Sequence, residues 1–212
     1  MLNKQIVVET WLCRGLEQMH VAFDLDEGPW LHYEPFFDYM ALELFCKAYV
    51  LAQKASEFEG LKNDLEIKRK VDKIARACSH DLAQMLSELN NAIGDNRINH
   101  ILSSNFDSFT GADIVKVLKA AYLECRYPVP ESISQKFPIE GTDMHWNPLY
   151  SSGLQKFVRA VGREVLLSLK TKFGLGIVRS YIDRVVLSKP SGERFCKLFF
   201  EDTIDEFILP AE

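Results

Sequence analysis

The chain has 212 residues, enough for one large domain, since a compact fold of this size buries roughly 70% of the surface that its unfolded chain exposes. A content of 47% hydrophobic and 26% charged residues is typical of a globular protein and excludes long disorder or a fibrous design. The formal net charge of −5 disfavours a protein that coats nucleic acid non-specifically, because such binding neutralises many phosphates with Lys and Arg.

The cysteines and the N-terminus indicate an intracellular address. The cysteines are odd in number and widely spaced, which favours reduced thiols over a disulfide framework: Cys13, Cys46, Cys78, Cys125 and Cys196. The N-terminus lacks a charged region followed by an apolar run, and no stretch approaches the roughly 18 uninterrupted apolar residues of a membrane span. We therefore expect a cytoplasmic protein that makes no contact with a membrane.

Two amphipathic helices are predicted in the first quarter of the chain. The first has one apolar stripe at helical spacing, formed by Val8, Leu12, Leu16, Met19 and Phe23. The second runs from Pro35, which suits a first helical turn, to about residue 55. Its stripe is widened by more apolar residues than one packing face needs, which predicts a central helix and a homodimer: Phe36, Met40, Phe45 and Tyr49.

Four more helices are predicted between residues 62 and 173. The charge run of the first, from 62 to 73, is interpreted as a solvated face, with a nucleic-acid patch as the alternative. Ser79 is expected to cap the second, which ends at Gly94. Thr110 and Asp113 have the spacing of a capping box at the start of the third. Residues 128–150 are predicted to form a long loop, and the helix at 152–173 ends at Gly174.

The segment 177–200 fits either a helical face or a β-hairpin. Its β-branched residues and the turn-like residues 189–193 favour the hairpin. The expected fold is therefore mainly α: an up-and-down helical bundle over residues 1–176, with a small C-terminal β-hairpin in an appendage at 177–212 that packs on the same domain.

The candidate chemical groups are histidines with an Arg nearby. No glycine pattern supports phosphate binding, and Cys78 and His80 form the only close Cys/His pair, so we expect no cofactor and no metal. Arg76 precedes His80 by four positions, which would place both on one face of a continuous helix. The pair Arg97 and His100, and the pair Arg126 and His145, are further combinations.

Each of these groups also has a simpler interpretation. His80 and Asp81 at a helix start are typical of a cap. Glu43 and Lys47, one helical turn apart, predict a surface ion pair worth a few tenths of a kcal/mol.

Three segments resemble the HEPN family of helical bundles. They are ALELFCKAY at 41–49, SHDLAQML at 79–86 and RYP at 126–128, and the resemblance covers about residues 33–173. It implies a bundle of four or five helices that usually dimerises, in a family of RNA-cleaving toxins and non-catalytic modules that bind RNA or nucleotides.

The chain departs from the pattern of the nucleolytic members. In these an Arg, usually followed by a polar residue, precedes a His with four to six residues between them. Three residues separate Arg76 from His80, two separate Arg97 from His100, and Glu131 follows Arg126 where the His is expected. The resemblance thus predicts binding without cleavage.

The leading hypothesis is a non-catalytic, homodimeric HEPN-like module that binds RNA, a nucleotide or a partner protein. The candidate binding residues are Lys47, Arg76, His80, Asp81, Arg126 and Tyr127. One alternative is a divergent, metal-independent ribonuclease of toxin-antitoxin type, whose partner would be a nucleotidyltransferase-type antitoxin. Another is a purely structural interaction protein.

Overall fold

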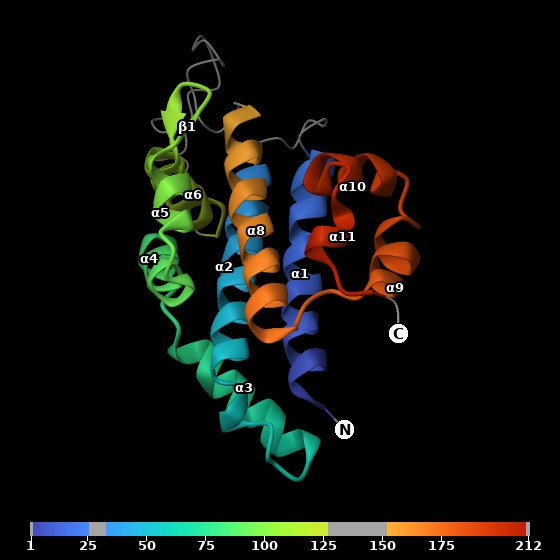
Figure 1. The fold of residues 1–212 in the computed structure, drawn as a ribbon. Coiled ribbons are helices and arrows are strands. Elements are labelled where there is room, and N and C mark those ends of the chain that lie inside the picture. Colours follow the sequence, from blue (N-terminus) through green and yellow to red (C-terminus); the bar gives the residue numbers. More distant parts are fainter. Residues whose placement is uncertain (1, 26–32, 127–151, 211–212) are drawn as a thin grey trace.

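The computed structural model describes residues 2–25, 33–126 and 152–210, and this part of the chain is mainly helical (Figure 1). The first half contains α1 (Lys4–Leu25), α2 (Glu34–Gln53), the 3₁₀ turn η2 (Ala55–Glu57), α3 (Asp64–Ala77) and α4 (Leu82–Ile93). The middle contains α5 (Arg97–Ser103), β1 (Asn105–Phe106), β2 (Phe109–Thr110) and α6 (Gly111–Arg126). The last part contains α8 (Ser152–Phe173), α9 (Arg179–Tyr181), the π-helical turn η5 (Ile182–Val186), α10 (Gly192–Phe200) and α11 (Ile204–Phe207).

Helix α2 occupies the centre of the fold, as its wide apolar stripe predicts. It packs against α1, α3, α4, α6 and α8. Phe45 and Tyr49 are buried, while Phe36 and Met40 are partly buried and pack against the core. The apolar residues that predicted a dimer are therefore used in packing within the chain.

Helices α1 and α2 form an antiparallel pair, and α8 lies beside them (Figure 1). Their close approach depends on Gly15, where a Cβ atom would lie 3.2 Å from the Phe45 ring and 3.3 Å from the Ala41 carbonyl oxygen. On one side of this layer lie α4, α5 and α6, and on the other the C-terminal helices. The three central helices thus fix the positions of the elements that carry the site.

The ends of two helices confirm the sequence predictions. Thr110 Oγ1 accepts a hydrogen bond from the Asp113 backbone N–H at 3.2 Å and donates one to Asp113 Oδ2 at 2.7 Å, so this pair caps α6. Gly174 follows α8 with a φ of +62°, the left-handed conformation that glycine adopts without steric cost. Strands β1 and β2 form a two-stranded antiparallel hairpin immediately before α6.

The C-terminal β-hairpin predicted over 177–200 is wrong. Residues 189–191 do lie in a turn, but the turn joins η5 to α10 rather than two strands. Phe195 and Phe199 lie one helical turn apart and are both buried in the common core. Residues 177–186 are rich in β-branched side chains, which favour a strand. The free energy gained by burying the two aromatic rings on one helical face is larger than this difference in local propensity between strand and helix.

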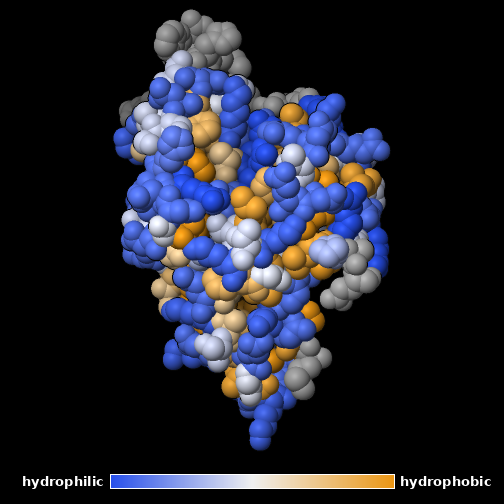
Figure 2. All heavy atoms as spheres, in the orientation of Figure 1, coloured by the Kyte–Doolittle hydropathy of each residue, from blue (hydrophilic) through white to orange (hydrophobic). Residues whose placement is uncertain are grey.

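One face of the molecule combines hydrophilic and apolar areas. Figure 2 shows hydrophilic side chains over most of one face, with smaller apolar areas near α8 and the C-terminal helices. Within the described ranges, no helix combines the length and the apolar character needed to cross a membrane.

Candidate functional site

The turn between α3 and α4 presents His80. Helix α3 ends at Ala77, and Cys78 is already extended, so Arg76 and His80 do not share a helical face as predicted. The cap of α4 is Asp81 rather than Ser79: its carboxylate accepts hydrogen bonds from the backbone N–H groups of Ala83 at 3.0 Å and Gln84 at 3.4 Å. Ser79 Oγ instead accepts from the Asp81 N–H at 2.9 Å, which tightens the turn before the cap.

His80 is held by two residues of α2. Its ring atom Nδ1 lies 3.0 Å from Glu43 Oε1, and its backbone carbonyl accepts a hydrogen bond from the Tyr39 hydroxyl. An ionised carboxylate only accepts hydrogen bonds, so Nδ1 is the ring nitrogen that donates its hydrogen to Glu43. The other ring nitrogen, Nε2, takes no part in this contact. The His80 side chain is 64% exposed even though both of its partners are buried. A surface imidazole is thus fixed in position by groups inside the bundle.

Glu43 and Lys47 form a buried ion pair, not the predicted surface pair. Their residues are 5% and 7% exposed, and Lys47 Nζ donates to Glu43 Oε1 at 2.5 Å. The pair lies in the interior because the neighbours of α2 cover it on several sides. The second carboxylate oxygen, Glu43 Oε2, has no hydrogen-bond partner among the described residues.

Asp81 joins α4 to α6. Its carboxylate forms an ion pair with Lys119, and the hydrogen bond from that side chain lowers the pKa of the Asp81 carboxyl group. The helix dipole adds to this stabilisation, because Asp81 lies at the N-terminus of α4. We call Tyr39, Glu43, Lys47, His80, Asp81 and Lys119 the His80 cluster.

The structure brings together three of the six predicted site residues: Lys47, His80 and Asp81. Arg76 points into solvent and forms an ion pair with Asp72 at 2.9 Å. Arg126 ends α6, but its side chain, with Tyr127 and His145, lies outside what the structure describes.

The second Arg and His pair belongs to another part of the surface. Arg97 makes ion pairs with Asp95 at 2.7 Å and Glu164 at 3.4 Å. His100 lines a shallow surface cavity beside them. The carboxylates that flank Arg97 neutralise its charge, which makes this pair a poor phosphate site.

A groove was expected near His80 and Arg126, and the groove that lies beside the His80 cluster is lined by none of the predicted site residues. It lies between α2, α3 and α4, has a volume of about 220 Å³ and is lined by apolar side chains together with Gln53, Lys54 and Glu88. Cys46 and Cys78 both line the groove. The groove lies next to the His80 cluster, because Cys46 adjoins Lys47 and Cys78 precedes His80 by two positions. No local sequence pattern indicates such a groove, because its width depends on the angle at which α3 leaves α2.

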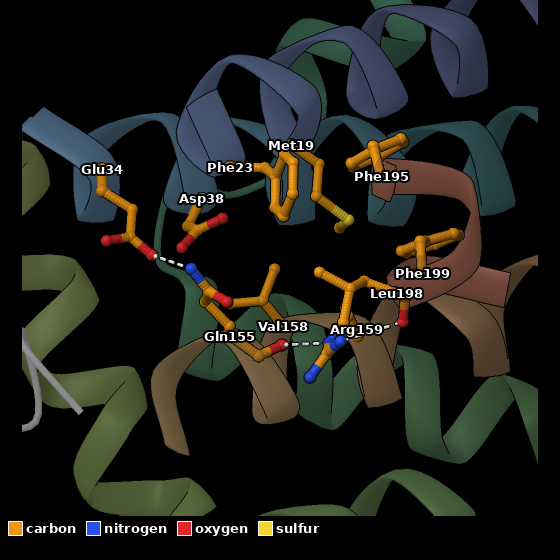
Figure 3. Close-up of a pocket in the computed structure, with 10 residues that line it drawn as sticks. All are labelled: Met19, Phe23, Glu34, Asp38, Gln155, Val158, Arg159, Phe195, Leu198 and Phe199. Atoms are coloured by element: carbon orange, nitrogen blue, oxygen red, sulfur yellow. Dashed lines mark hydrogen bonds between the residues drawn. The ribbon is translucent and has the colours of Figure 1, made fainter. Parts of the chain in front are cut away.

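Two buried carboxylates were also missed. Glu34 and Asp38, one turn apart at the start of α2, face Gln155 and Arg159 of α8 across a small cavity (Figure 3). Gln155 Nε2 donates to Glu34 Oε1 at 3.1 Å, and Arg159 Nη1 donates to the carbonyl oxygen of Leu198 at 2.9 Å. The cavity holds only about 20 Å³, scarcely more than the roughly 10–15 Å³ that one water needs. It is therefore a packing site too small for a ligand, with walls formed mostly by apolar side chains of α1, α8 and α10.

Neither a metal centre nor a known relative accounts for these sites. Among the described residues, no group of three or more His, Cys, Asp or Glu side chains is arranged to hold a metal ion. Searches among protein-family models, curated proteins and solved structures found no significant match.

Proposed function

We propose that the chain is a HEPN-like helical module that binds a nucleotide, RNA or a partner protein through the surface around His80 and does not cleave RNA. The proposal rests on the resemblance in sequence and on the convergence of its two motifs in space. Glu43 and Lys47 come from the first motif and His80 and Asp81 from the second, and all four meet in one cluster.

The observation that carries the non-catalytic part of the proposal is the pairing of the cations. Lys47 is bonded to Glu43, Lys119 to Asp81 and Arg76 to Asp72. Cleavage of RNA without a metal needs a cation to stabilise the charge that develops on the phosphate. Each of these three cations is instead already paired with a carboxylate.

A metal-independent ribonuclease is the second candidate, and one contact favours it. A buried carboxylate that fixes one ring nitrogen of an exposed histidine is the arrangement by which enzymes orient a general base. Glu43 and His80 have this geometry. They would still need a phosphate-binding cation.

RNA cleavage in the presence of a chelator distinguishes the two candidates. We expect no cleavage of labelled tRNA or mRNA by the wild-type protein, and binding of RNA or a fluorescent nucleotide that weakens in His80→Ala. His100→Ala is the matched control, because His100 is also exposed but lies outside the cluster. Cleavage that falls about a hundredfold or more in His80→Ala and not in His100→Ala would establish the ribonuclease.

The proposed dimer rests on the family resemblance alone, since the apolar residues of α2 pack within the chain. Light scattering at micromolar concentration tests it directly. A monomer mass there would remove the dimer from the proposal and leave the binding surface unaffected.

A further inference from the structure

The groove between α2, α3 and α4 has the size and the lining of a small-ligand site. Its volume of about 220 Å³ greatly exceeds the roughly 10–15 Å³ that a single water needs. Tyr49 and Val50 line it from α2, Ile74 from α3, and Met85 and Leu89 from α4. Gln53, Lys54 and Glu88 complete the lining, so the groove suits a small molecule that combines an apolar part with a polar group.

The two thiols in the groove are part of its apolar wall. Burial raises the pKa of Cys46 to about 12 and also raises the pKa of Cys78. Both thiols are therefore protonated at neutral pH and uncharged in the groove wall. Cys78 Sγ donates to the carbonyl oxygen of Ile74 at 3.4 Å, a contact that keeps the thiol at the wall.

Charge is found at the mouth of the groove. Lys54, the residue that follows α2, is exposed and makes no ion pair with any described residue. Glu88 of α4 also lines the groove, and the hydrogen bond that it accepts from the neutral amide of Gln84 at 2.8 Å leaves its negative charge in place. The nearby Lys47 is neutralised by Glu43. Lys54 is thus the cation at this mouth that is open to an anionic group.

We propose that this groove binds a small aliphatic carboxylate, with the hydrocarbon chain between α2, α3 and α4 and the carboxylate at Lys54. The apolar walls would supply most of the affinity, and the Lys54 ammonium would fix the direction in which the chain enters. The groove adjoins the His80 cluster but shares no lining residue with it, so the inference goes beyond the proposed function and does not depend on it.

A titration calorimetry series of butanoate, hexanoate and octanoate tests the apolar part. Affinity is expected to rise about fourfold with each methylene that enters the groove. Ala77→Trp places a large side chain at an exposed position in the groove lining and should abolish octanoate binding. Ala112→Trp, at an exposed position of α6, is the matched control and should bind octanoate as the wild type does.

Comparison with octanol tests the role of Lys54. Lys54→Gln is expected to weaken octanoate binding about threefold to fivefold, the effect of an exposed ion pair, and to leave octanol binding unchanged. Lys68→Gln makes the same change of charge on the exposed face of α3 and should leave both ligands unaffected. Equal weakening by the two Lys variants would show that net charge, rather than the site, attracts octanoate.

Three outcomes would overturn the proposal. They are the absence of saturable octanoate binding at millimolar concentration, an affinity independent of chain length, and full binding by Ala77→Trp. His80→Ala separates this inference from the proposed function, because it should weaken nucleotide or RNA binding while octanoate binding stays unchanged.

Discussion

Lys47 has surroundings that are unusual for its residue type, because it is buried. Lysine is seldom fully buried unless it is paired, and here the pair is Glu43. Transfer of both charges from water is costly, and their attraction offsets that cost only while both are present. The two residues therefore contribute to stability as a unit.

Replacement of Lys47 alone should be strongly destabilising. In Lys47→Met the Glu43 carboxylate stays buried without its ammonium partner, and the free energy of unfolding is expected to fall by about 3–5 kcal/mol. Urea unfolding monitored by circular dichroism measures this fall in the free energy of unfolding. The double variant Glu43→Leu with Lys47→Met should recover a large part of the loss, since no charge is then buried. Lys68→Met, on the exposed face of α3, should change stability little.

His20 should make stability depend on pH. It is buried, its ring stacks on Phe195 with centroids 4.4 Å apart, and Nε2 lies 2.7 Å from Ser191 Oγ. Burial lowers the pKa of His20 below its ordinary value of 6.5, outweighing the opposite effect of Asp24. The unfolded chain therefore takes up a proton at a pH where the folded chain does not. The free energy of unfolding should fall as the pH drops below about 6.5.

Comparison of two glutamine variants checks this origin. His20 can lower the free energy of unfolding by at most about 1.4 kcal/mol for each pH unit below the ordinary histidine pKa. Melting temperatures measured from about pH 7.5 to 5.5 should depend on pH less steeply in His20→Gln than in the wild type. His100→Gln, at an exposed position, should retain the wild-type slope. An unchanged slope in His20→Gln would assign the pH dependence to other groups.

Among the elements, α10 depends on one close backbone approach at its first residue. A Cβ atom at Gly192 would overlap the carbonyl oxygen of Val186, at the end of η5. Gly192→Ala should therefore lower the free energy of unfolding by about 1–3 kcal/mol, because backbone must move to relieve the overlap. Gly60→Ala is the control, since a Cβ atom there would meet no atom within 4 Å and no such loss is expected. Chemical denaturation of both variants makes the comparison.

Helices with a clear apolar stripe and an end signal could be predicted from the sequence. The helix expected at 152–173 matches α8 because its stripe is regular and Gly174 ends it. The segment after residue 177 could not be predicted, since its β-branched residues suit either structure and contact with α1 and α8 decides between them. Local sequence carries no information about that contact.

The site was predictable only in its parts. The resemblance identified Lys47, His80 and Asp81, but the contact of His80 with Glu43 joins residues 37 positions apart. Such a contact depends on how α4 packs on α2, which no local pattern encodes. The burial of the Glu43 and Lys47 pair was missed for the same reason.

At the scale of the whole molecule, no disulfide joins the cysteines whose side chains the structure describes. These cysteines are Cys13, Cys46, Cys78 and Cys196, and all four are free. Dithiothreitol should therefore leave the melting temperature unchanged in differential scanning calorimetry. A fall of several degrees would reveal a disulfide, in which Cys125 would be the first candidate because it lies where the side chains are not described.

The central place of α2 has an evolutionary consequence. Most of its residues are buried, and they meet α1, α3, α4, α6 and α8. A substitution there must be compatible with several neighbours at once, so compensating changes would have to arise on more than one helix. The outer face of α3 meets solvent and carries no such constraint. Among descendants of this chain, sequence drift should therefore be slowest along α2 and fastest on α3, and α2 is the segment by which a distant relative would be recognised.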